Sequence, residues 1–146
     1  MRSPMIFGGL TLTACLLAPP VLGAGFFRSV ADADARKECG ACHMPYPPAL
    51  MPARSWEKIL GSLDSHFGEN ASLPEPTRLK ILAYMTGYAG DAPKGNAWFM
   101  ARLRKTDTPA RITEMPFWRA IYGGFSLRSF KRAGVKRPGN CLGCHG

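Results

Sequence analysis

Apolar residues recur with the period of an α-helix between residues 55 and 67. They stand at offsets 0, 3, 4, 7, 10 and 11 from Trp56, which places them on one helical face. Ser55 precedes the series, and its hydroxyl suits an N-cap. The pattern therefore predicts one amphipathic helix whose apolar face is made by Trp56, Ile59, Leu60, Leu63, His66 and Phe67.

The rest of the chain also favours short helices over strands. A second helix is predicted to begin at residues 74–77, where two prolines suit a helix start, and to stop near Gly87 or Gly90. No segment shows a strand-like alternation of useful length. The predicted fold class is all-α, with helix-prone segments 31–38, 97–104 and 108–124 set among proline- and glycine-rich loops.

The N-terminus predicts export. Arg2 precedes an uncharged apolar run over residues 5–22, and small residues follow at 23–24. This is typical of a cleaved secretory signal over residues 1–24, which predicts a periplasmic protein with a mature chain of 25–146. One alternative is an uncleaved N-terminal membrane anchor, because the run is close to spanning length. A lipoprotein signal ending at Cys15 is the weakest reading, because the residues after it stay apolar.

Two Cys-x-x-Cys-His motifs, at residues 39–43 and 141–145, carry the chemistry. Two cysteines at this spacing can bond the two vinyl groups of one porphyrin, and the histidine that follows can bind its iron. Loss of Cys15 with the signal leaves no odd thiol. Structural zinc, local disulfides and a thioredoxin-like motif fit the spacing less well. The motifs predict two haem c groups, bonded by Cys39, Cys42, Cys141 and Cys144.

The iron ligands follow from the histidine count, since the chain holds only three histidines. His43 and His145 belong to the motifs, and His66 is the remaining one. A histidine on an apolar face is by itself more often a core residue. Here a haem iron lies nearby in sequence, and we predict that His66 is the second ligand of haem 1, giving a six-coordinate iron of low reduction potential.

No histidine remains to complete haem 2. Its sixth ligand is predicted to be Tyr122 or Met115, with Met85, Met100, lysine, water or an open position as alternatives. An open position would allow nitric oxide, carbon monoxide or oxygen to bind, or peroxide to be reduced. A turn at residues 91–95 divides the mature chain into a haem 1 half, about 25–90, and a haem 2 half, about 91–146.

These blocks together resemble the dihaem cytochrome c family, whose members donate electrons to an oxygen-binding monohaem cytochrome. The resemblance covers residues 38–48, 52–56, 66–73, 111–118 and 140–145. It implies an all-α periplasmic electron carrier, not an enzyme, with a distal histidine at His66. The family also has a histidine shortly after its Phe-Trp pair. This chain departs there, and Tyr122 stands at about that position.

The charge of the mature chain bears on its partners. Without Arg2 it has 18 basic and 10 acidic side chains, a formal +8, and four haem propionates would lower this to about +4. Such a charge favours an acidic redox protein, such as the monohaem cytochrome or a membrane cytochrome, or peripheral contact with an anionic membrane. Export argues against nucleic acid as the partner. A solvated basic face is the plainer alternative.

Overall fold

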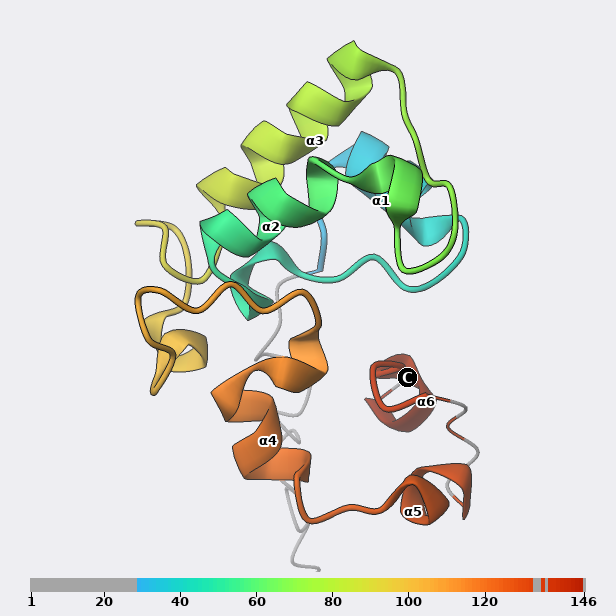
Figure 1. The fold of residues 1–146 in the computed structure, drawn as a ribbon, viewed down its shortest axis with the longest axis vertical. Helices are drawn as coiled ribbons and strands as arrows, with labels where there is room; N and C mark the ends of the chain where they lie inside the picture. Colours follow the sequence, from blue (N-terminus) through green and yellow to red (C-terminus); the bar gives the residue numbers. More distant parts are fainter. Residues whose placement is uncertain (1–28, 133–134, 136, 146) are drawn as a thin grey trace, which may run out of the picture.

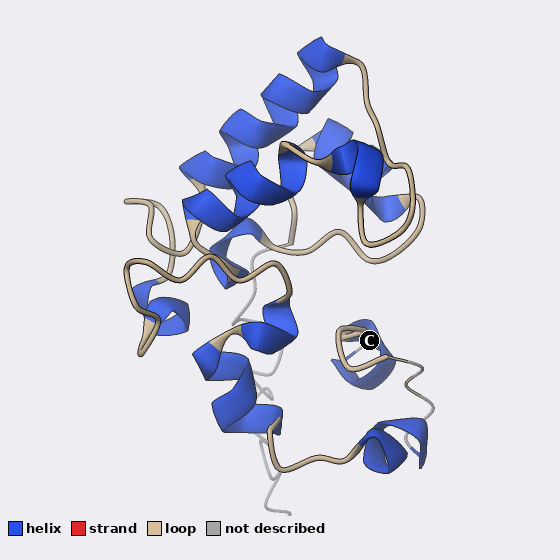
Figure 2. Ribbon diagram, viewed as in Figure 1, coloured by secondary structure: helices blue, strands red, loops and turns tan. Residues whose placement is uncertain are grey.

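The computed structural model describes residues 29–132, 135 and 137–145 (Figure 1). The predicted signal over residues 1–24 lies outside the described residues. Helices and loops make up the described part, which contains no strand and a single isolated bridge (Figure 2). The all-α prediction is therefore confirmed. Among the described helices, none combines the length and apolar character needed to cross a membrane.

The helices gather toward two ends of the molecule, with α1, α2 and α3 at one and α4, α5 and α6 at the other (Figure 1). Four short 3₁₀ turns connect them. The α-helices are α1 Ala33–Gly40, α2 Ala53–Leu60, α3 Glu75–Gly87, α4 Pro116–Tyr122, α5 Leu127–Arg132 and α6 Leu142–His145. The 3₁₀ turns are η2 Pro48–Leu50, η3 Leu63–Ser65, η4 Ala97–Met100 and η5 Ile112–Glu114.

Helix α2 is shorter than the hydrophobic pattern predicts. It begins at Ala53 after an N-cap at Pro52 and ends at Leu60, so the prediction of one helix through Phe67 is wrong beyond that point. Ser55 lies inside the helix and is fully buried, and so it is not the cap. Gly61 ends the helix, and the Ser62 hydroxyl donates to the carbonyl of Lys58 at 2.9 Å. Both features favour a turn over a further helical turn.

Helix α3 begins and ends as predicted, at Glu75 and Gly87. It packs along α2, and the core between them holds Trp56, whose indole N–H donates to the carbonyl of Pro48 at 2.8 Å. The same core continues into the second half of the chain through Phe99, Ile112, Met115 and Phe117. The chain thus buries residues from both sides of the turn at 91–95 in one cluster.

Hydrogen bonds near α2 also join the two halves. The Arg54 guanidinium donates to the carbonyls of Asp107, at 2.6 Å, and Arg104, at 3.0 Å, and forms an ion pair with Asp91 at 3.2 Å. The Asp91 carboxylate also accepts from the backbone N–H of Ala53 at 2.8 Å. These contacts hold the loop after α3 against the start of α2. The loop itself turns at Gly95, where any Cβ would clash with the carbonyl of Ala89.

Candidate haem sites

The first Cys-x-x-Cys-His motif lies at the end of α1. Asp32 caps this helix by accepting from the backbone N–H of Ala35 at 2.8 Å. Cys39 lies in the last turn and is partly buried, and Cys42 follows the helix and is exposed. Burial, with smaller effects from Glu38 and Asp32, raises the pKa of the Cys39 thiol. Both cysteines are free of disulfides, as thioether attachment requires.

His43 has one ring nitrogen in use and one available. Its Nδ1 lies 2.7 Å from the carbonyl oxygen of Met44. A carbonyl oxygen only accepts hydrogen bonds, so this contact assigns the proton to Nδ1. Nε2 then carries the lone pair. An imidazole that donates from one nitrogen and binds metal through the other is the usual arrangement of a metal-ligating histidine.

His66 is presented by a tight turn that follows η3. Its N–H donates to the carbonyl of Glu69 at 2.8 Å, and the N–H of Glu69 donates back at 3.1 Å. The two central residues have positive φ, 53° at Phe67 and 100° at Gly68, as in a type I′ turn. Such a φ is uncommon for a bulky residue like Phe67. The Arg111 guanidinium packs over the Phe67 ring, 4.1 Å from its centroid.

The rings of His43 and His66 lie close together, at a separation that matches two imidazoles bound to one iron. Their centroids are 6.2 Å apart and their planes are 20° from parallel. Two metal–nitrogen bonds of about 2 Å, plus roughly 1 Å from each nitrogen to its ring centre, span about 6 Å. Burial, followed by the nearby His43 and Arg111, lowers the pKa of His66. The neutral ring that a metal needs is therefore favoured.

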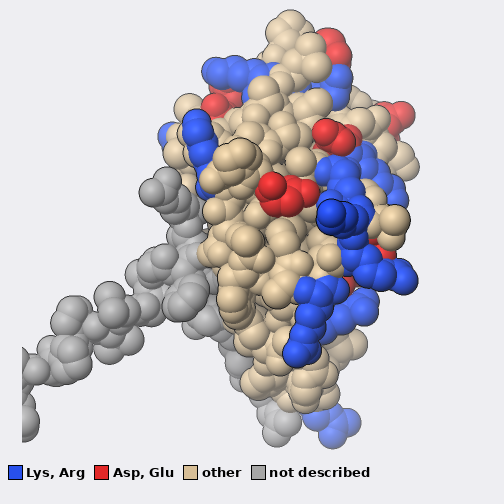
Figure 3. Space-filling model, turned by 90° about the vertical axis from the view of Figure 1, so that its left-hand side faces the viewer, with Lys and Arg blue, Asp and Glu red and all other residues tan. Residues whose placement is uncertain are grey.

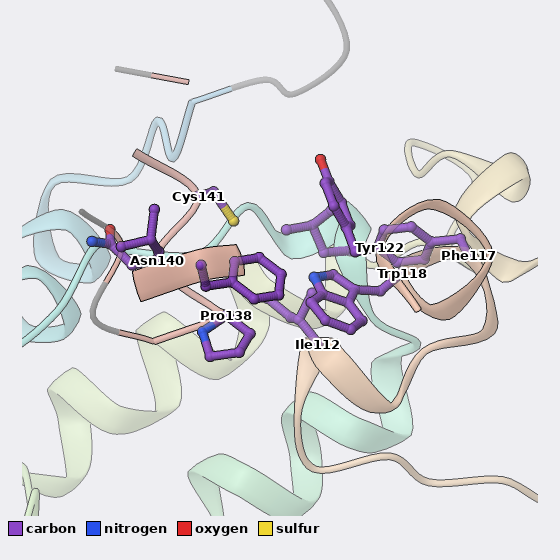
Figure 4. Close-up of a pocket in the computed structure, with 10 residues that line it drawn as sticks. Ile112, Phe117, Trp118, Tyr122, Pro138, Asn140 and Cys141 are labelled. Atoms are coloured by element: carbon purple, nitrogen blue, oxygen red, sulfur yellow. The ribbon is translucent and has the colours of Figure 1, made fainter. Parts of the chain in front are cut away.

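The second motif lies at α6, on the opposite side of a pocket from α4. The side chains of Cys144 and His145 lie outside the described residues, so their predicted roles stay predictions. Cys141 precedes α6, and its sulfur lies 3.6 Å from the carbonyl of Gly139. Figure 4 shows this sulfur at the wall of the pocket, beside an apolar and aromatic lining.

This haem 2 pocket has a cavity volume of about 50 Å³ and is partly open to solvent. The stacked rings of Trp118 and Phe130, with centroids 6.3 Å apart, form part of its wall. The first half of the chain contributes Leu50. The lining consists of Leu50, Ile112, Phe117, Trp118, Tyr122, Phe130, Val135, Pro138, Asn140 and Cys141.

The two candidates for the sixth ligand of haem 2 have different surroundings. Tyr122 lines the pocket at the end of α4, with its ring 5.4 Å from that of Trp118 (Figure 4). Met115 is fully buried in the core cluster and is not among the pocket residues. Within the described part of the chain, no group of three or more histidine, cysteine or acidic side chains is placed to hold a separate metal ion.

Tyr46 links the two motifs, a role that its sequence position does not reveal. Its ring packs on His43, with centroids 5.2 Å apart, and its hydroxyl donates to the carbonyl of Gly139 at 2.9 Å. Burial raises the pKa of Tyr46, which keeps the hydroxyl a donor. A Cβ at Gly139 would lie 2.9 Å from that hydroxyl, so glycine permits the contact. Nearness to the first motif is the only local signal, because the partner is 93 residues away.

Comparisons with known proteins agree with this geometry. The family model for dihaem cytochrome c matches residues 35–146. A solved dihaem cytochrome c from Rhodobacter sphaeroides is 41% identical, with a TM-score of 0.71, and the match covers 80% of this chain and 91% of that one. No curated protein matches this chain.

Two further solved structures are similar. A protein described as DHC, also from Rhodobacter sphaeroides, is 37% identical, with a TM-score of 0.64 over 80% of this chain and 92% of that one. A dihaem cytochrome c from Shewanella baltica is 31% identical, with a TM-score of 0.61 over 77% and 79%. With its neighbouring histidines and aromatic pocket, the chain belongs to the dihaem cytochrome c family and carries two haem c groups.

Proposed function

We propose that this protein is a periplasmic electron carrier that passes single electrons between redox partners and changes no substrate bonds. The observation that carries the proposal is the His43–His66 pair, whose rings lie 6.2 Å apart. An iron held between two imidazoles has no open position for a substrate. A haem bound there supplies reversible one-electron chemistry, and the chain sets its potential through these ligands.

Each predicted residue has a defined task in this function. Cys39, Cys42, Cys141 and Cys144 attach the porphyrins, and His145 binds the second iron on the side of its motif. Met44 keeps the proton on Nδ1 of His43 through its carbonyl. The partner is a redox protein, and the family resemblance favours an oxygen-binding monohaem cytochrome or a membrane cytochrome. The proposed function involves neither a nucleic acid nor a soluble substrate.

Spectroscopy of the purified, haem-loaded protein tests the proposal. We expect a positive haem stain after denaturation, two haems per chain, and a low-spin c-type spectrum that is reversibly reduced. Electron paramagnetic resonance should show one haem with the signature of paired imidazoles. A negative stain, or a single haem per chain, would contradict the assignment.

A second candidate function is the binding of a small ligand at haem 2. It is favoured by the lack of a fourth histidine and by a pocket whose candidate ligand is a tyrosine. Addition of carbon monoxide to the reduced protein separates the two functions. Rapid formation of a carbon monoxide complex would support ligand binding at haem 2. A purely low-spin protein that forms no such complex supports electron transfer alone.

The periplasmic location rests on the N-terminal signal and is tested separately. We expect the mature protein to begin near Ala24 or Gly25 and to be released with the periplasmic fraction. N-terminal sequencing measures the first, and osmotic shock the second. An intact N-terminus in the membrane fraction would favour the anchor instead.

A further inference from the structure

The excess positive charge of this protein lies in one half of the chain. Residues 25–90 contain seven basic and seven acidic side chains, a formal charge of zero. Residues 91–146 contain eleven basic and three acidic side chains, a formal +8. Two propionates on each haem would leave about +6 in the second half and about −2 in the first. The mature protein is therefore strongly polarised between its two haem halves.

Ion pairs deepen this contrast. In the first half, Lys37, Arg78 and Lys80 are each paired with a carboxylate of that half, at 2.6 to 2.9 Å. The three acidic residues of the second half are all engaged as well: Asp91 by Arg54, Asp107 by Arg104, and Glu114 by the backbone N–H groups of Ala110 and Arg111. These three carboxylates therefore already have partners within the protein and do not neutralise the other basic side chains of the second half.

Most basic side chains of the second half consequently face solvent without a carboxylate. In the described part of the chain, no ion pair is seen for several of its exposed cations. These are Lys94, Arg102, Lys105, Arg119, Arg128, Lys131 and Arg137. Figure 3 shows the result on one face: acidic and basic side chains mix over the end that holds α1 to α3, whereas the lower end shows basic ones alone.

Apolar side chains are exposed in the same half. Phe125, between α4 and α5, is 59% exposed, and Leu127, the first residue of α5, is 67% exposed. Leu142 is 58% exposed and follows Cys141, which lines the haem 2 pocket. The exposed cations Arg119 on α4 and Arg128 and Lys131 on α5 belong to the same helices or adjoin these apolar residues. Apolar side chains with charged ones beside them are typical of protein interfaces.

We infer that the face around the haem 2 pocket is the docking surface for an acidic electron-transfer protein, so that haem 2 exchanges electrons with that partner. The inference rests on the proposed electron-carrier function. Charge of one sign around a docking surface steers a partner of the opposite sign and raises the association rate, most strongly at low salt. The first half, at about −2 with its propionates, does not attract an acidic partner, so the partner is oriented toward haem 2.

A charge-reversal experiment tests the docking surface. The variant Arg119→Glu/Lys131→Glu changes two exposed cations on α4 and α5. The matched control Lys58→Glu/Lys80→Glu changes two exposed cations on α2 and α3 and has the same net charge. The probe is a reduced flavodoxin, an acidic one-electron donor. Stopped-flow absorbance measures its second-order reaction with the haem-loaded protein at low and at physiological salt.

We expect the α4/α5 variant to react about tenfold more slowly than the unmodified protein at low salt, and the difference to shrink as salt screens the charges. The control should react within about twofold of the unmodified protein. If the two variants slow equally, only net charge matters and the docking surface is refuted. Unchanged rates in both variants would refute it as well.

Two further measurements separate this inference from its alternatives. Binding to phosphatidylglycerol vesicles, measured by sedimentation, would overturn it if the α4/α5 variant lost vesicle binding while its reaction with flavodoxin was unchanged. Mediated spectroelectrochemistry of each sample tests electron transfer alone. Failure of the electron-carrier proposal would appear there as the lack of a reversible redox change. Failure of the docking proposal would leave that change intact.

Discussion

The two haem sites of this protein are assembled in different ways. In the first, both proposed ligands come from nearby segments: His43 follows α1, and His66 lies in the turn after η3. The centroids of their rings are 6.2 Å apart. In the second, the pocket is built from segments far apart in sequence, from Leu50 to Cys141, and its described ligand candidate is a tyrosine.

This difference bears on what each haem can do. The two imidazoles proposed for the first iron would close it to substrates and favour a low reduction potential. The second site has one proposed motif histidine and a pocket with aromatic walls, in the half of the chain that carries the excess positive charge. The first site therefore suits storage and transfer of an electron. The second site suits exchange with a partner, and its sixth position decides whether ligands can also bind.

The largest expected effect comes from replacing the distal ligand of the first site. His66→Met should keep haem 1 six-coordinate and raise its reduction potential by on the order of 0.1 V or more, within the roughly 0.8 V that axial ligands span. Haem 2 should change little. A spectroelectrochemical titration resolves the two waves. Two unchanged potentials would show that His66 is not a ligand and would remove the basis of the comparison.

A pair of substitutions sharpens the description of the second site. Tyr122→Phe should change the spectrum of haem 2 toward a high-spin form that binds carbon monoxide, because the phenol oxygen proposed to bind the iron is lost. Met115→Leu keeps the core volume, so it should leave that spectrum unchanged and cost less than about 1.5 kcal/mol of stability. Visible spectra and urea unfolding measure the two effects. If only Met115→Leu alters the spectrum, the sixth ligand of haem 2 is Met115 and not Tyr122.

The last prediction concerns stability rather than the properties of the haems, and it addresses the contact between the sites. Gly139→Ala should destabilise the protein by about 1–3 kcal/mol, because its Cβ would crowd the Tyr46 hydroxyl. Tyr46→Phe removes one hydrogen bond and should cost about 0.5–1.5 kcal/mol. In the double variant the crowding is relieved, so the two costs should not add. Urea unfolding of the four proteins gives this cycle, and strict additivity would show that the two residues are not coupled.

The sequence by itself determined the chemistry of this protein. The two motifs predict the attachment residues and the histidine count predicts the His66 ligand, whereas the prediction of α3 from its prolines to its final glycine is confirmed. These features can be predicted from the sequence because covalent attachment and helix ends depend on residues a few positions apart. The same periodicity gave a wrong prediction beyond Leu60. The apolar residues keep their helical spacing in the sequence, but α2 ends there, and Gly61 and the 3₁₀ turn η3 follow.

Only the tertiary structure decided how distant residues meet. It placed Leu50 in the wall of the haem 2 pocket, Arg111 over Phe67, and the Tyr46 hydroxyl on the carbonyl of Gly139. It also separated Tyr122, on the pocket, from Met115, in the core. Such contacts depend on how helices pack and where loops cross, which the local pattern of side chains does not encode.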